Sequence, residues 1–156
     1  MPMLSKLQDL LDRNHISYGH TVHRPTFTAR QLARAEHVPE NVVAKTVVFV
    51  GDRGYGLAVL PADCAADLDE LRDRLGLSHV RLATEPELSA LFSDSEPGAE
   101  PPFGNLYGVP VYVDDVLCSE DSIAFNAGTH RDAVHMRLRD FMRLVRPQIV
   151  PFSYFQ

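Results

Sequence analysis

The sequence lacks the features of a membrane-bound or exported protein. It contains no run of the roughly 18 to 20 consecutive apolar residues that a membrane-spanning helix needs. Its first residues do not combine a basic segment with a long apolar stretch, which is the pattern of an export signal. We therefore expect a cytoplasmic protein that has no membrane partner.

Common catalytic and metal-binding motifs are also absent. The two cysteines, Cys64 and Cys118, belong to no CxxC or CxxH pattern, so we expect idle thiols in a reducing compartment. No HExxH motif, GxSxG motif or glycine-rich phosphate-binding loop occurs, and the spacing of the histidines does not favour a metal site. We therefore expect neither a metal nor a cofactor.

Positive charge is scarce as well. Lysine and arginine total 15 against 21 acidic residues, which gives a formal net charge of −6. This balance argues against a protein that coats DNA or RNA through its phosphates. It does not exclude a protein that binds only a single-stranded RNA end in a small pocket.

The remaining composition is that of a globular protein. The 156 residues are 45% hydrophobic and 23% charged, and they predict one domain over residues 1–156. Leucines at helical spacing predict an opening helix that ends near Asn14. Further helices are expected at Ala29–Ala35, capped by Thr26 or Thr28, at Asp67–Leu75, ended by Gly76, and around Arg139–Val145. Thr84 and Glu87 predict a capping box for a helix that reaches Phe92. The expected strands are Ile16–Val22, which alternates like a half-buried strand, Lys45–Val50 and Tyr55–Leu60, which a turn at Gly51–Gly54 joins, and Val80–Ala83, Val109–Val113, Ser122–Asn126 and Ala133–Leu138. This interleaving predicts an α/β or α+β fold with a mixed sheet.

The longest irregular segment covers residues 93–105. It contains three prolines and two glycines, which exclude regular helix or strand. Loops of this length in compact domains are usually functional or disordered. Within it, Pro102, Phe103 and Gly104 indicate either a stiff structural turn or a rigid wall whose phenyl ring stacks on a ligand.

Two other places could carry chemistry. Lys45 opens an apolar strand, where it is either a strand-end lysine that reaches water or a cation aimed at a phosphate or carboxylate. Asn126, Ala127, Gly128, Thr129 and His130 follow a predicted strand. Small residues there let a substrate approach the main chain, and His130 is either a surface or packing residue or a group that exchanges a proton near neutral pH.

Four segments in this order resemble the YbaK/EbsC and prolyl-tRNA-synthetase-associated editing family, also called INS-like. They are residues 43–48 (VAKTVV), 96–104 (EPGAEPPFG), 108–114 (GVPVYVD) and 125–130 (FNAGTH). The resemblance spans roughly residues 20 to 147. It implies a mixed, partly barrel-like sheet surrounded by helices, and hydrolysis of the ester between an amino acid and the terminal adenosine of a mischarged tRNA.

The resemblance also implies roles for individual residues. Lys45 would hold the 3′-end of the substrate, with Gly128 and His130 as the other catalytic residues. Gly104 and Gly128 would line the aminoacyl pocket, and backbone N–H groups would stabilise the developing oxyanion without a protein nucleophile or a metal. The predicted substrate-binding residues are Thr46, Pro102, Phe103, Gly104, Asn126, Ala127 and Thr129.

The amino acid removed is less well defined. The turn ending in His130 resembles the branch of the family that acts on small amino acids, so Ala-tRNA(Pro) is the expected substrate and Cys-tRNA(Pro) the next. Thr46 departs from the asparagine that alanine-specific members often carry after the lysine. A synthetase is an expected partner, because an acidic free-standing editor needs help to recruit tRNA. The alternatives are a non-catalytic aminoacyl-adenosine or protein-binding module, and a hydrolase of another small ester or thioester.

Overall fold

The computed structural model describes residues 3–156. Five α-helices occur in this part of the chain: α1 (Ser5–Arg13), α2 (Ala29–Glu36), α3 (Leu68–Leu75), α4 (Glu85–Leu91) and α5 (Leu138–Val145). The strands are β1 (Tyr18–Val22), β2 (Ala44–Gly51), β3 (Gly54–Pro61), β4 (Cys64–Ala66), β5 (Val80–Leu82), β6 (Val111–Val113), β7 (Ser122–Asn126), β8 (Asp132–Arg137), β9 (Gln148–Ile149) and β10 (Ser153–Phe155). Short 3₁₀ turns occupy Glu40–Val42, Gly104–Leu106 and Asp115–Ser119.

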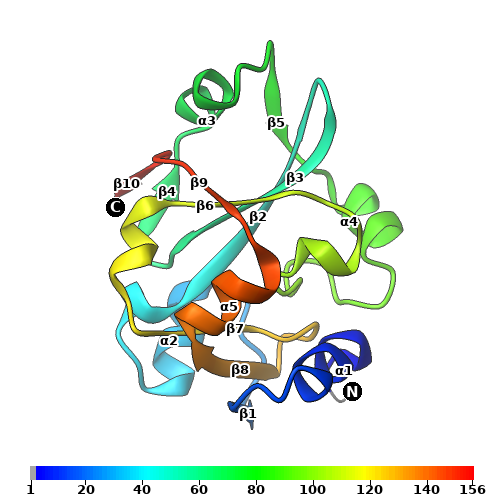
Figure 1. Ribbon diagram of the computed structural model, residues 1–156, viewed down its shortest axis with the longest axis vertical. Coiled ribbons are helices and arrows are strands. Elements are labelled where there is room, and N and C mark those ends of the chain that lie inside the picture. Colours follow the sequence, from blue (N-terminus) through cyan, green and yellow to red (C-terminus); the bar gives the residue numbers. More distant parts are fainter. Residues whose placement is uncertain (1–2) are drawn as a thin grey trace.

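The strands form three sheets. The largest has the order β5-β2-β3-β6-β9 and is mixed, because β3 pairs with β2 antiparallel and with β6 parallel. A second sheet has the order β1-β8-β7, and β4 pairs with β10 in a third. In Figure 1 the long β2–β3 hairpin runs obliquely through the molecule, with α3 and β5 near its tip and β7, β8, α1 and α2 near its other end. The α+β fold class predicted from the sequence is confirmed.

Local sequence signals account for the helix boundaries. Thr28 caps α2 by accepting a hydrogen bond from the Gln31 N–H, and the side chain of Asp67 caps α3 in the same way. Gly76 ends α3 in the left-handed conformation that glycine adopts without steric cost. Thr84 and Glu87 form the predicted capping box of α4. No helix in the described residues is both long and apolar enough to cross a bilayer.

One isolated bridge joins the two larger sheets. Val43, just before β2, pairs in parallel with Ala124 of β7, and both residues are fully buried. Both residues belong to a small buried cluster with side chains of α2, whereas their chain neighbours Ala44 and Phe125 belong to the largest cluster. The bridge therefore holds the start of β2 beside the end of β7 in a rigid setting.

Three expectations need correction. The sequence did not predict the short strands β4, β9 and β10, which have only two or three residues each and therefore carry no clear alternation. β1 was expected to be half-buried, but His20 and Val22 are exposed because only β8 covers this edge strand. The segment 93–105 was expected to be wholly irregular, yet a 3₁₀ turn begins at Gly104.

Candidate active site

The bridge between Val43 and Ala124 also places the first two candidate side chains. Because the pairing is parallel, Lys45 and Asn126 lie two residues beyond the bridge on neighbouring chains, in equivalent positions. Lys45 lies near the start of β2, and Asn126 is the last residue of β7. Figure 1 shows β7 and α2 in the same part of the molecule. Two residues far apart in the sequence therefore reach the same pocket.

This pocket has a volume of about 160 Å³. Its walls come from three regions: the start of β2 with the end of β7, the N-terminal end of α2, and the loop before Pro101. The lining residues are Phe27, Thr28, Ala29, Ala44, Lys45, Thr46, Gly98, Glu100 and Asn126. The pocket is smaller than the roughly 300 to 1,000 Å³ of a typical small-molecule site, which favours a small ligand group.

Lys45 is a half-buried cation. Burial lowers the pKa of its ammonium below the ordinary value, and the nearby Arg30 guanidinium lowers the pKa further, whereas Cys64 and Asp63 oppose the shift. Lys45 forms no ion pair with any acidic residue in the described chain. An unpaired lysine held in a pocket is a ready site for a phosphate or another anionic group.

The N-terminal end of α2 forms the second wall. Thr28 and Ala29 line the pocket, and the Thr28 side chain accepts from the Gln31 N–H. The backbone N–H groups of Ala29 and Arg30 lie in the first turn, where a helix offers them no acceptor. Such groups carry partial positive charge and stabilise a nearby oxyanion.

Gly98 and Glu100 form the third wall. Glu100 is only 5% exposed, and its Oε1 accepts a hydrogen bond from the Gly98 N–H at 3.1 Å. Burial raises the pKa of the Glu100 carboxyl above the ordinary value, although backbone N–H donors and His130 oppose the shift. Gly98 has φ +89, a conformation that side-chain-bearing residues rarely adopt.

The glycine turn after β7 has a different role from the one predicted. The Gly128 N–H donates to the Ala99 carbonyl at 3.0 Å, and the Gly128 carbonyl accepts from the Glu96 N–H at 2.8 Å. The turn therefore fastens the loop that carries Gly98 and Glu100, and the N–H of Gly128 is not free for an oxyanion. Gly128 does not line the pocket, contrary to the expectation from the resemblance.

Ala127 and Thr129 are also outside the pocket. Ala127 is fully buried in the main core. The Thr129 hydroxyl donates to Asp132 Oδ2 at 2.5 Å and accepts from the N–H groups of Arg131 and Asp132. These contacts use the full capacity of the hydroxyl to hold the turn, so neither residue has a group left for substrate in this structure.

His130 lies behind the pocket wall. Its backbone N–H donates to Glu96 Oε1 at 2.6 Å, and its Nε2 donates to the Pro97 carbonyl at 2.9 Å, since a carbonyl only accepts. Its ring packs against Phe27, with centroids 5.1 Å apart. Nδ1 is buried and has no hydrogen-bond partner in the described chain. His130 thus positions the loop, and direct catalysis by it stays a prediction.

The segment Pro102–Gly104 does not form a wall of the pocket. Pro102 is buried, and Phe103 is 0% exposed, with its ring packed on Phe125 and Phe141. A β-carbon added to Gly104 would lie 2.2 Å from the Val109 carbonyl oxygen, so this glycine allows a close backbone approach in the core. The expectation that Phe103 offers an accessible ring is wrong.

The structure therefore brings together only three of the predicted site residues, namely Lys45, Thr46 and Asn126. Sequence reasoning missed six lining residues: Phe27, Thr28, Ala29, Ala44, Gly98 and Glu100. Two signals were available for some of these. Thr28 was one of the two expected helix caps, and Glu100 lies in a segment too rich in proline to be an ordinary solvated acidic stretch.

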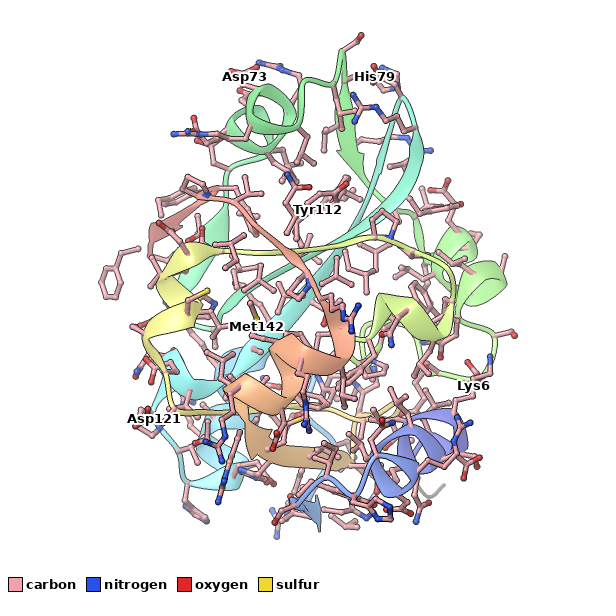
Figure 2. All side chains as sticks on the ribbon, in the orientation of Figure 1. Lys6, Asp73, His79, Tyr112, Asp121 and Met142 are labelled. Carbon is pink, nitrogen blue, oxygen red and sulfur yellow. The ribbon has the colours of Figure 1, made fainter. Side chains whose placement is uncertain are left out.

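Other candidate sites are weaker. Burial raises the pKa of both cysteine thiols, which disfavours the nucleophilic thiolate. Within residues 3–156, no group of three His, Cys, Asp or Glu side chains is placed to hold a metal ion. A larger hollow of about 620 Å³ is lined by residues that include Asp121 and Met142, both labelled in Figure 2, but it contains none of the candidate residues. The small pocket is where the polar groups converge, and we take it as the site.

Comparison with known proteins identifies the family of the chain. The model of the aminoacyl-tRNA editing domain matches residues 23–144. The chain belongs to the aminoacyl-tRNA editing domain family. It is 35% identical over 103 residues to the multifunctional Ser/Thr-tRNA deacylase ProXp-y of Escherichia coli strain K12, and equally to that of strain O157:H7. The match covers 65% of this chain and 61% of the length of these relatives.

Solved structures share the fold over nearly the whole chain. The hypothetical protein APE2540 is 19% identical, with a TM-score of 0.85 and coverage of 96% of this chain and 100% of the other. A candidate trans-editing enzyme for prolyl-tRNA synthetase is 24% identical, with a TM-score of 0.83 and coverage of 96% and 95%. At these identities the likeness establishes the fold of this editing-domain protein and no more.

Proposed function

We propose that this editing-domain protein is a free-standing deacylase that hydrolyses the ester between a small amino acid and the terminal adenosine of a mischarged tRNA. The observation that carries the proposal is the small pocket at the junction of β2, β7 and α2, which is lined by the unpaired cation Lys45 and by Thr28 and Ala29 at the N-terminal end of α2. The family match and the names of the Escherichia coli relatives support the same reaction class.

In this proposal Lys45 positions the substrate, and the first turn of α2 stabilises the developing charge. Lys45 binds a phosphate or ribose oxygen at the 3′-end of the tRNA and so positions the ester. The N–H groups of Ala29 and Arg30 stabilise the negative charge that develops on the carbonyl oxygen when water or a ribose hydroxyl attacks. Loss of one such donor typically costs about 3 to 4 kcal/mol of transition-state stabilisation.

The size of the pocket limits the amino acid. A volume of about 160 Å³ accommodates the side chain of alanine, cysteine, serine or threonine together with the ester group, but it leaves little room for an aromatic or long side chain. Alanine and cysteine follow from the resemblance in sequence, and serine and threonine follow from the names of the relatives. The hydroxyl of Thr46 and the carboxamide of Asn126 in the lining favour a polar side chain such as that of serine.

The negative net charge of the chain is consistent with a protein that binds only the 3′-end of its tRNA. With a net charge of −6, it has little capacity to hold the tRNA body through phosphates. We propose that it acts in the cytoplasm, on tRNA delivered by a synthetase. Editing of this kind is needed because a synthetase pocket separates amino acids differing by one methylene by only about 1 to 3 kcal/mol.

A panel of substrates tests the proposal. The wild-type protein is mixed with Ala-tRNA(Pro), Cys-tRNA(Pro), Ser-tRNA, Thr-tRNA and Pro-tRNA(Pro), and with matching aminoacyl-nucleotide analogues. We expect turnover of one or more small aminoacyl-tRNAs and slow turnover of the analogues. Equal rates on tRNA and analogue would indicate a general small-ester hydrolase, and no turnover by the folded protein would indicate a binding module.

A further inference from the structure

Glu100 is a buried carboxyl group that the reaction described so far does not use. It lines the pocket and is only 5% exposed, although charged side chains are rarely buried unless they are paired. None of the ion pairs in the described chain includes it. Its Oε1 accepts the Gly98 N–H at 3.1 Å, and no side chain among residues 3–156 donates to the carboxyl.

One acceptor in the same pocket is unsatisfied. Asn126 Oδ1 is buried and has no hydrogen-bond partner in the described chain. Buried polar atoms are nearly always paired in folded proteins, so an open acceptor beside a carboxyl group in one small pocket requires an explanation. A ligand group with several donors would bond to both. An ammonium group has three donors and a positive charge, which also suits the carboxylate.

The charges in the pocket match an aminoacyl-tRNA in their arrangement. Lys45 lies near Arg30, Asp63 and Cys64, whereas Glu100 lies near Gly98 and His130. Lys45 and Glu100 form no ion pair with each other, so the pocket offers a cation on one wall and an acid on another. The substrate end carries the complementary pair, a phosphate on one side of the ester and an α-ammonium on the other.

Resting on the function proposed above, we propose that Glu100 is a specificity-determining residue that binds the α-ammonium of the aminoacyl group, with Asn126 as a second acceptor. This contact requires an α-amino acid and excludes other acyl groups of the same size. It also orients the ester between Lys45 and the first turn of α2. Burial raises the pKa of the Glu100 carboxyl, and a cation bound beside the carboxyl lowers that pKa again.

The test compares two acyl groups that differ in one atom. The aminoacyl-tRNA hydrolysed fastest in the panel is converted to its α-hydroxyacyl counterpart by nitrous acid, which turns alanine into lactate and serine into glycerate. Wild type should hydrolyse the aminoacyl ester with a kcat/KM about 10- to 100-fold above that of the hydroxyacyl ester, as expected for one charge-assisted hydrogen bond. Glu100→Gln should lose most of this preference by slowing only the aminoacyl ester.

A matched variant separates recognition from loop structure. Glutamine at 100 keeps an oxygen for the Gly98 N–H, and Glu96→Gln makes the same chemical change in the same loop, where Glu96 binds the backbone N–H of His130. Glu96→Gln should change both substrates by the same factor. Thermal denaturation verifies that both variants are folded.

The outcomes distinguish this inference from the proposed function. Equal wild-type rates on the two esters, or an unchanged preference in Glu100→Gln, would refute the role of Glu100 and leave the deacylase intact. A Glu100→Gln defect confined to seryl and threonyl esters would mean that Glu100 binds the side-chain hydroxyl instead, which also overturns the inference. Absence of any wild-type turnover would refute the proposed function itself.

Discussion

Two phenylalanines provide a sharp test of where the pocket lies. Phe103 was the residue expected to stack on a ligand, yet it is 0% exposed and packs on Phe125 and Phe141 with ring centroids 5.5 and 5.3 Å apart. Phe27 is 73% exposed and lines the pocket beside His130. The same substitution, phenylalanine to leucine, should therefore lower the stability of the fold at Phe103 and weaken substrate binding at Phe27.

The magnitudes follow from the packing. Phe103→Leu removes two aromatic pairs, each worth about 0.5 to 1.5 kcal/mol beyond the buried area, so the free energy of unfolding should fall by about 1 to 3 kcal/mol. For a domain of this size, each kcal/mol corresponds to about 2 to 4 °C in Tm. Phe27→Leu removes an exposed contact and should change the free energy of unfolding by no more than about 0.5 kcal/mol.

The assay measures Tm and steady-state deacylation on both variants, with activity taken well below the lower Tm. Phe103→Leu should melt early with kcat/KM within about threefold of wild type, and Phe27→Leu should melt normally with a raised KM for the aminoacyl-tRNA because it forms part of the binding wall. A stable Phe103→Leu protein that had lost activity would refute the reasoning and restore the stacking role of Phe103.

Three further predictions concern the turn after β7 and the buried lysine. Gly128→Ala should lower the free energy of unfolding by about 2 to 5 kcal/mol in chemical denaturation, because Gly128 has φ +98 and the new β-carbon would lie 2.9 Å from Leu4 Cβ. A fully stable variant would contradict the structural role of this turn. Thr129→Val should lower the free energy of unfolding by about 2 to 4 kcal/mol in the same assay, because the Asp132 carboxylate and two backbone N–H groups lose a buried hydrogen-bond partner. A loss below about 0.5 kcal/mol would show that other groups satisfy them. Burial lowers the pKa of Lys45, so the folded protein binds this proton less tightly than the unfolded chain. The free energy of unfolding of wild type should therefore rise with pH between the lowered pKa and 10.5. This rise should be missing from the pH dependence of Lys45→Met.

The sequence predicted the regular elements because their signals are local. The capping box at Thr84 and Glu87 and the glycine stop at Gly76 each act within one helical turn, and both are confirmed. Of the two expected caps of α2, Thr26 and Thr28, the structure shows Thr28. The hairpin turn at Gly51–Gly54 is local in the same sense. Strands of two or three residues carry no usable period, so β9 and β10 escaped prediction.

The site was harder to predict because it depends on which way a loop faces. The segment from Glu96 to Gly104 divides in the middle: Gly98 and Glu100 face the pocket, whereas Phe103 and Gly104 pack in the core. Residue types did not reveal this division, since an exposed wall and a buried turn both use proline and glycine. The pairing of Lys45 with Asn126 depends on a single long-range bridge, which no local pattern encodes.

The central claim is that Lys45 holds the substrate in the small pocket, and the chain offers a natural control for testing it. The only other lysine, Lys6, lies on α1 (Figure 2) with a side chain that is 53% exposed and pairs with Asp94. It does not line the pocket. We would measure single-turnover deacylation of the preferred mischarged tRNA by wild type, Lys45→Ala and Lys6→Ala, after verifying that both variants are folded. The account predicts that Lys45→Ala loses about 100-fold or more in rate, as expected when a positioning contact is removed, while Lys6→Ala stays within about threefold of wild type. Full activity in a folded Lys45→Ala protein would contradict the account.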